Sequence, residues 1–159
     1  MMRKILLGAV RFMLPAWVGG AALFVITSVL EVTANQPEID SVVRDALVGL
    51  RFPPYYAFGG FLLGCSLVAG GILSLGGCAS KRRLQIATAL VLTASVLMIV
   101  DYIWIYQPLF EMVTPPGKAR TPRFETLHDA SKHINSVGLL LAAIAGGLFC
   151  WSAPDATKG

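Results

Sequence analysis

The sequence predicts an all-α protein, a four-helix transmembrane bundle with a short amphipathic helix in its first extracytoplasmic loop. Two observations support this fold class. Hydrophobic residues make up 55% of the chain and charged residues only 14%, whereas about a quarter of the residues in soluble domains are charged. Four apolar segments, at about 8–31, 55–76, 84–106 and 133–151, approach the roughly 20 residues that cross a hydrocarbon core. Backbone groups in lipid must be hydrogen-bonded internally, so these spans should be helices, and residues 1–159 should form one integral membrane domain.

The first span follows a basic start, Arg3 and Lys4. Its apolar run from Phe12 to Leu30 is longer than the roughly 7–15 apolar residues of a signal peptide. We therefore expect an uncleaved transmembrane helix here.

Apolar residues recur at helical spacing in the loop after the first span. They are Ile39, Val42, Val43, Ala46, Leu47 and Leu50. Pro37 suits the first turn of such a helix, and Pro53-Pro54 should end it. We expect this amphipathic helix to lie on the outer membrane surface or to cap the bundle.

An interfacial belt of aromatic residues should mark the end of the third span. Its members are Tyr102, Trp104, Tyr106 and Phe110. Pro108 should kink or end this helix, and Pro115-Pro116-Gly117 should form the turn that precedes the fourth span.

Basic residues predict the orientation of the chain, because Lys and Arg concentrate in cytoplasmic segments. They flank the first span and fill the loop between the second and third spans: Arg3, Lys4, Arg11, Lys81, Arg82 and Arg83. Lys118, Arg120 and Arg123 in the third loop favour the opposite orientation. On balance we expect a multi-pass protein of the inner (plasma) membrane with both termini in the cytoplasm.

Small residues in two spans should allow close helix packing, as in small-xxx-small motifs. They are Gly60 and Gly64 in the second span and Gly138, Ala142 and Gly146 in the fourth. On a helical wheel the face of the fourth span that bears its small residues continues outward through Phe124, His128, Ser131 and Asn135. These polar residues should therefore point toward neighbouring helices.

Two carboxylates should lie at a similar depth. Asp101 follows Leu84 by 17 residues, about 25 Å along a helix, and Glu31 ends the first span on the same side. We predict an outer-leaflet polar cluster of Glu31, Asp101, His128, Ser131 and Asn135. Three roles stay open: interhelical hydrogen bonding, a contact surface for another subunit, or a site. As a site, His128, Asp101 and Glu31 would hold a divalent cation or relay protons.

Other function classes find no support in the sequence. It contains no nucleophile–base pair, phosphate loop or metalloprotease motif, so we expect no enzymatic activity. Its two histidines point in opposite directions from one helix, which excludes bis-histidine haem ligation, and no cofactor is predicted. A basic patch interleaved with aromatic residues is also lacking, so nucleic acid is not an expected partner.

The residues Phe124, Leu127, His128, Ser131 and Asn135 form the pattern F-x-x-L-H-x-x-S-x-x-x-N within RFETLHDASKHIN. This pattern resembles the signature of a small four-helix integral membrane family of unknown function. The family includes bacterial proteins and the eukaryotic transmembrane protein 205. The resemblance is confined to the C-terminal end, and Lys132 and the amphipathic loop helix lie outside it. It implies a helical bundle without established enzymatic activity, sometimes linked to metal or drug resistance.

Together these observations predict a non-enzymatic structural or accessory subunit of a membrane assembly. Its partners would be the lipid bilayer and either further copies of itself or other membrane subunits. The alternative is a small transporter or sensor that handles a cation or protons at the polar cluster.

Overall fold

The computed structural model describes residues 1–33, 40–76 and 81–151. They form an all-α four-helix bundle, as the sequence predicts. The elements are α1 (Met2–Thr33), α2 (Ser41–Leu75), α3 (Lys81–Val100), a π-helix η1 (Asp101–Tyr106), α4 (Gln107–Met112) and α5 (Pro122–Cys150). Because α3, η1 and α4 follow one another without a break, the chain makes four rods. Each rod is long and apolar enough to cross a membrane.

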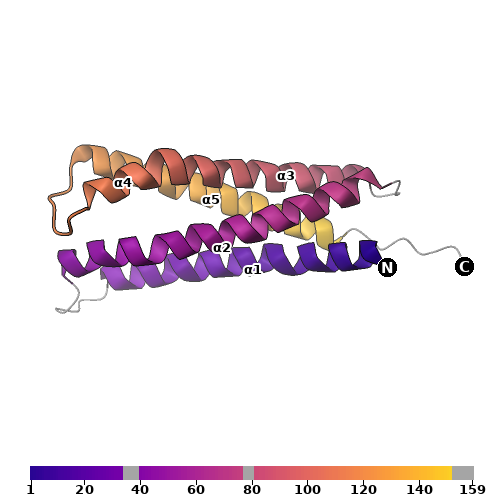
Figure 1. Ribbon diagram of the computed structural model, residues 1–159, viewed down its shortest axis with the longest axis horizontal. Helices are drawn as coiled ribbons and strands as arrows, with labels where there is room; N and C mark the ends of the chain where they lie inside the picture. The colour runs from indigo at the N-terminus through magenta and orange to yellow at the C-terminus, as the bar shows by residue number, and fades with distance from the viewer. Residues whose placement is uncertain (34–39, 77–80, 152–159) are drawn as a thin grey trace, which may run out of the picture.

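The four rods alternate in direction, so the start of α1 and the end of α5 lie at the same end of the bundle (Figure 1). We call the end that holds Met2 and Cys150 the terminal end, and the opposite end, which holds Thr33 and Pro122, the distal end. Helix α1 packs against α2 and α5, and α3 packs against the same two helices. The rods therefore form a closed ring of four neighbours around one core.

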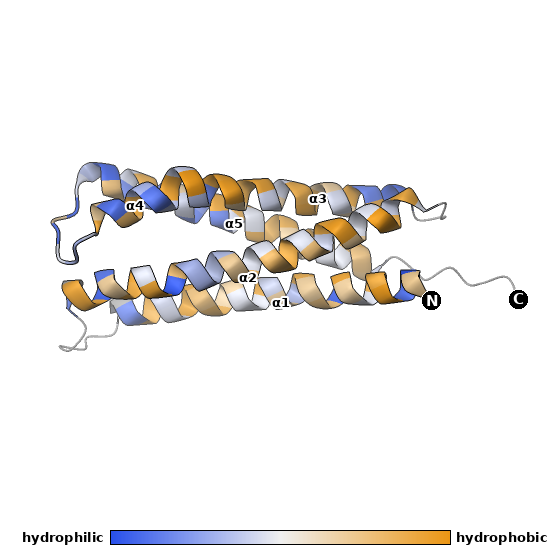
Figure 2. Ribbon diagram, in the orientation of Figure 1, coloured by the Kyte–Doolittle hydropathy of each residue, from blue (hydrophilic) through white to orange (hydrophobic). Residues whose placement is uncertain are grey.

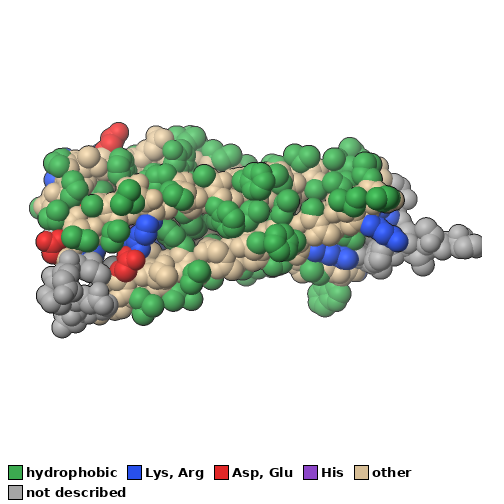
Figure 3. All heavy atoms as spheres, turned by 60° about the horizontal axis from the view of Figure 1, so that its bottom comes forward, with side chains coloured by type: hydrophobic (Ala, Val, Ile, Leu, Met, Phe, Trp, Pro, Cys, Tyr) green, Lys and Arg blue, Asp and Glu red, His purple; other side chains and the backbone are tan. Residues whose placement is uncertain are grey.

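The core contains side chains from all four rods. Leu14, Leu63, Leu84 and Phe149 are among the largest fully buried ones. The outer surface is also apolar: hydrophobic side chains cover the middle of the bundle, and charged ones gather toward its two ends (Figures 2 and 3). Such a surface suits a hydrocarbon environment.

The amphipathic loop helix does not exist as a separate element. Its predicted start at Pro37 lies outside the described residues, and Asp40 caps α2, which then continues through Pro53 and Pro54 to Leu75. Proline removes an amide donor, but helices in apolar surroundings tolerate it where neighbouring contacts hold the backbone. Here Arg51 pairs with Glu31 of α1, Nη1 to Oε2 at 2.5 Å.

The predicted apolar face of this segment is also wrong. Val42, Val43 and Leu50 are exposed, and Asp45 is buried instead. Asp45 accepts a hydrogen bond from the Gly117 amide at 3.0 Å and pairs with Arg120, Nη2 to Oδ1 at 3.5 Å. The first turns of α2 therefore extend the rod and attach the loop before α5.

Pro108 does not end the third rod, which continues through α4 to Met112. The helix widens one turn earlier, where the Gln107 amide donates to the Tyr102 carbonyl five residues back. Pro108, which has no amide hydrogen to donate, follows directly after this π-helical bond. The predicted turn at Pro115-Pro116-Gly117 lies between α4 and α5, and Gly117 has a positive φ of 88°.

Two arginines cap α5 at the terminal end. Arg11 donates from Nε to the Phe149 carbonyl at 3.0 Å and from Nη2 to the Cys150 carbonyl at 3.1 Å. Arg83 donates to the Trp151 carbonyl at 2.9 Å. The last carbonyls of an α-helix have no amide of a following turn to bind, so the guanidinium groups stabilise the negative end of α5.

Replacing Arg11 with methionine should lower the free energy of unfolding by about 1 kcal/mol, because α5 loses two charge-assisted bonds at its C-terminus. Thermal unfolding in detergent, followed by circular dichroism, measures this loss. Lys4→Met removes a charge from the same end and serves as the control. An equal loss in both variants would contradict a specific capping role.

Candidate functional site

Asp101 is the centre of the candidate site. It is the first residue of η1 and its side chain is fully buried. Tyr56 of α2 donates its hydroxyl to Asp101 Oδ2 at 2.6 Å, and Asn135 of α5 donates from Nδ2 to the same oxygen at 2.6 Å. One carboxyl oxygen therefore joins three of the four rods.

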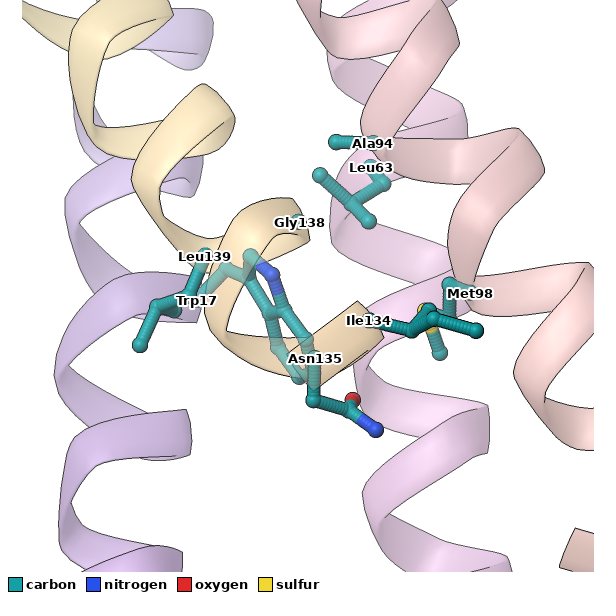
Figure 4. Close-up of a pocket in the computed structure, with 8 residues that line it drawn as sticks. All are labelled: Trp17, Leu63, Ala94, Met98, Ile134, Asn135, Gly138 and Leu139. Carbon is teal, nitrogen blue, oxygen red and sulfur yellow. The ribbon is translucent and has the colours of Figure 1, made fainter. Parts of the chain in front are cut away.

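Further hydrogen bonds extend from Asn135. Its Oδ1 accepts from the Tyr55 hydroxyl at 3.2 Å, and its Nδ2 lies 3.0 Å from the Ser131 carbonyl and 3.2 Å from Ser131 Oγ. Figure 4 shows the Asn135 side chain extending from α5 toward α2. We call these five residues, Tyr55, Tyr56, Asp101, Ser131 and Asn135, the Asp101 network.

Aromatic rings enclose the Asp101 network. The Tyr56 ring lies 5.0 Å from the Tyr102 ring and 5.1 Å from the Tyr106 ring, centre to centre. On the α1 side, the Trp17 ring lies 5.1 Å from that of Tyr55. An apolar wall of this kind lowers the local dielectric and strengthens the hydrogen bonds inside it.

A small cavity adjoins Asn135 (Figure 4). Its volume is about 10 Å³, and its lining comes from all four rods: Trp17, Leu63, Ala94, Met98, Ile134, Asn135, Gly138 and Leu139. This volume is close to the minimum that holds one water molecule. It has no room for an organic ligand.

The structure brings together three of the five residues of the predicted polar cluster: Asp101, Ser131 and Asn135. Glu31 lies apart from them, paired with Arg51. His128 is exposed and stacks on Phe124, with ring centres 5.8 Å apart. It precedes Asn135 by two helical turns, about 10 Å along the axis. The helical wheel groups His128 with Asn135, but the His128 side chain does not reach the polar cluster.

The predicted metal ligands, His128, Asp101 and Glu31, do not lie together either. Among the described residues, no three His, Cys, Asp or Glu side chains are close enough together to hold a metal ion. His128, Asp101 and Glu31 are therefore not assembled as ligands.

The predicted packing residues fall into two groups. On α5, Ala142 and Gly146 are buried, and a Cβ added at Gly146 would lie 3.5 Å from Leu14 of α1. Gly138 faces α3, where an added Cβ would lie 4.0 Å from the Ala94 carbonyl. On α2, by contrast, a Cβ added at Gly60 or Gly64 would meet no atom within 4 Å in the described structure.

Gly60 and Gly64 instead line an open groove between α2 and α3. Its volume is about 500 Å³, within the range of about 300–1,000 Å³ typical of binding pockets. Most of the other lining side chains are apolar, and the tyrosines lie toward its distal end: Pro53, Tyr56, Ala57, Leu63, Leu67, Ser95, Met98, Ile99 and Tyr102.

Sequence reasoning missed Tyr55 and Tyr56 as members of the site. A pair of tyrosines at the distal start of the second span was the available signal. Both lie at the depth of Asp101 in the next span, and a buried carboxyl there needs hydrogen-bond donors. Asp45 was missed as well, since its position on a charged helix face gave no sign of burial.

Comparison with protein-family models, curated proteins and solved structures finds no match to this chain. The resemblance to the transmembrane protein 205 family therefore stays a prediction from the residues around His128.

Proposed function

We propose that this chain is a non-enzymatic structural or accessory subunit of a membrane assembly, and that it assembles through the groove between α2 and α3. The observation that supports the proposal is that Gly60, which is exposed, and Gly64, which is half-buried, line this groove with no atom of the described structure within 4 Å of an added Cβ. These glycines are four residues apart, the spacing that allows two helix backbones to approach closely in lipid. No helix of the described structure makes that approach.

The occupant of the groove is the α2 helix of a second copy. Two α2 helices that cross at Gly60 and Gly64 present the same surface to each other, which is the self-complementary arrangement of a two-fold dimer. The apolar lining, with Leu63 and Leu67 beside the glycines, suits a partner helix without charges.

The distribution of charge supports a cytoplasmic location for both termini in an inner (plasma) membrane. The terminal end holds six basic residues: Arg3, Lys4, Arg11, Lys81, Arg82 and Arg83. All acidic residues of the described chain lie in the distal half. The distal half of the described chain holds six basic residues as well, so the expected orientation depends on the first span, which usually dominates. Its basic residues Arg3, Lys4 and Arg11 lie on the terminal side.

Gly60→Leu and Gly64→Leu should each weaken the dimer at least about 10-fold, equivalent to about 1.4 kcal/mol, because the new side chain separates the two backbones. Native mass spectrometry of gently extracted protein gives the dimer fraction across concentrations. Gly19→Leu is the matched control, since Gly19 is exposed on α1 and has no neighbour within 4 Å.

A monomeric wild-type protein, or a dimer that persists in both groove variants, would contradict the proposal. A different subunit that is lost from both variants would show that the groove binds that subunit and not a second copy.

The alternative function is a small transporter or sensor, which would handle either a divalent cation or protons. The divalent-cation form loses its support, because the proposed ligands are dispersed. The proton form retains a specific observation, which concerns the second oxygen of Asp101.

A further inference from the structure

The two carboxyl oxygens of Asp101 have different surroundings. Oδ2 accepts hydrogen bonds from Tyr56 and Asn135. Oδ1 is buried and has no hydrogen-bond partner. An acceptor with no donor and no water contact is rare inside proteins, and it requires an explanation.

The groups that face Asp101 are uncharged near neutral pH. They are Tyr55 and Tyr56 from α2 and Ser131 and Asn135 from α5. From its own rod, Tyr102 and Tyr106 pack against the Tyr56 ring. Arg51, the cation closest in sequence to Tyr56 on α2, pairs with Glu31 of α1. No Lys, Arg or His of the described chain forms an ion pair with Asp101.

Asp45 provides a comparison within the same chain. It is also buried, but it has a cation, Arg120, and a backbone donor, Gly117. A buried carboxylate normally has such a counter-charge. Asp101 has two neutral donors on one oxygen and nothing on the other.

We infer that Asp101 is a proton-binding site, with a neutral carboxyl in this arrangement and the proton on Oδ1. An ionised carboxylate without a cation is strongly disfavoured at membrane depth. A proton neutralises it and needs no cavity, whereas a metal ion needs both space and further ligands. Uptake forms one O–H bond at Oδ1 with a proton from water, and the hydrogen bonds to Oδ2 remain in place.

The place of Asp101 in the helix supports the inference independently. It begins the π-helix η1, and short π-helical segments occur frequently at functional sites. Tyr56 both lines the groove and donates to Asp101, but the inference rests on the surroundings of the Asp101 carboxyl and does not require a second copy in the groove.

Infrared spectroscopy of the full-length protein in liposomes at neutral pH tests this inference. The wild type should show the C=O stretching band of a protonated carboxylic acid. This band should be lost in Asp101→Asn and kept in Asp45→Asn, which changes the other buried aspartate. Absence of the band in the wild type, or its persistence in Asp101→Asn, would overturn the inference.

Tyr56→Phe provides a second measurement if Asp101→Asn fails to fold. It removes one donor from Oδ2, so the band should persist and move to higher wavenumber. Tyr102→Phe is the matched control, because the Tyr102 ring contacts Tyr56 without a hydrogen bond to Asp101. A band that is identical in wild type and Tyr56→Phe would assign the proton to another group and reject the site.

Discussion

Replacing Asp101 with leucine is expected to lower the free energy of unfolding by about 2–3 kcal/mol, because the Tyr56 hydroxyl and one Asn135 amide hydrogen lose their shared acceptor. Both donors are enclosed by aromatic rings and have little access to water. Asp101→Asn should cost no more than about 1 kcal/mol, since an amide oxygen still accepts from Tyr56. Denaturant unfolding in detergent micelles measures both changes.

Asp129→Asn is the control for this series. Its side chain is exposed and pairs with Lys132, so this variant should unfold at nearly the same denaturant concentration as the wild type. A leucine variant as stable as the wild type would show that the Asp101 network does not hold α2, η1 and α5 together. A large loss in Asp101→Asn would indicate an ionised carboxylate and would argue against the bound proton.

Gly59→Ala is expected to destabilise the bundle by about 1–3 kcal/mol through overpacking. An added Cβ would lie 2.5 Å from Trp17 Cη2 and 2.8 Å from Met98 Cε. Trp17 is buried and packs against Tyr55 and Phe58, so its ring can move away from the new methyl group only by giving up these contacts. This cost exceeds the roughly 0.5–1 kcal/mol that alanine gains over glycine within a helix.

Gly60→Ala is a control one residue away. An added Cβ there meets nothing within 4 Å, so only the helix preference of alanine remains and stability should be unchanged or slightly higher. Thermal unfolding of monomeric protein in detergent separates the two cases. Equal effects at Gly59 and Gly60 would mean that Trp17 does not pack against α2 as described.

The four spans could be predicted because the length of an apolar run is a local property of the sequence. Which face of each span packs against the other helices could not be predicted. In lipid the core and the outer surface are equally apolar, so Gly59, which packs against Trp17, and Gly60, which faces the groove, look alike. The small-xxx-small pattern selected Gly60 for this reason.

The candidate site shows a related limit. A helical wheel orders residues by angle, which placed His128 with Asn135, but contacts also require equal depth. Glu31 was grouped with Asp101 because both lie toward the same membrane face. Its partner Arg51 was assigned to a separate helix that Pro53-Pro54 should have ended. Once α2 is continuous, Arg51 reaches Glu31, and Tyr55 and Tyr56 reach the Asp101 network.

The π-helix η1 also changes which residues of the third rod share one face of the helix. A π-helical turn contains more residues than an α-helical one, so residues beyond Tyr106 are rotated relative to a regular helix drawn from Lys81. The faces of α3 and α4 are therefore out of phase. Any alignment or wheel drawn across Asp101 must introduce this phase shift, or it will assign the side chains of α4 to the wrong neighbours.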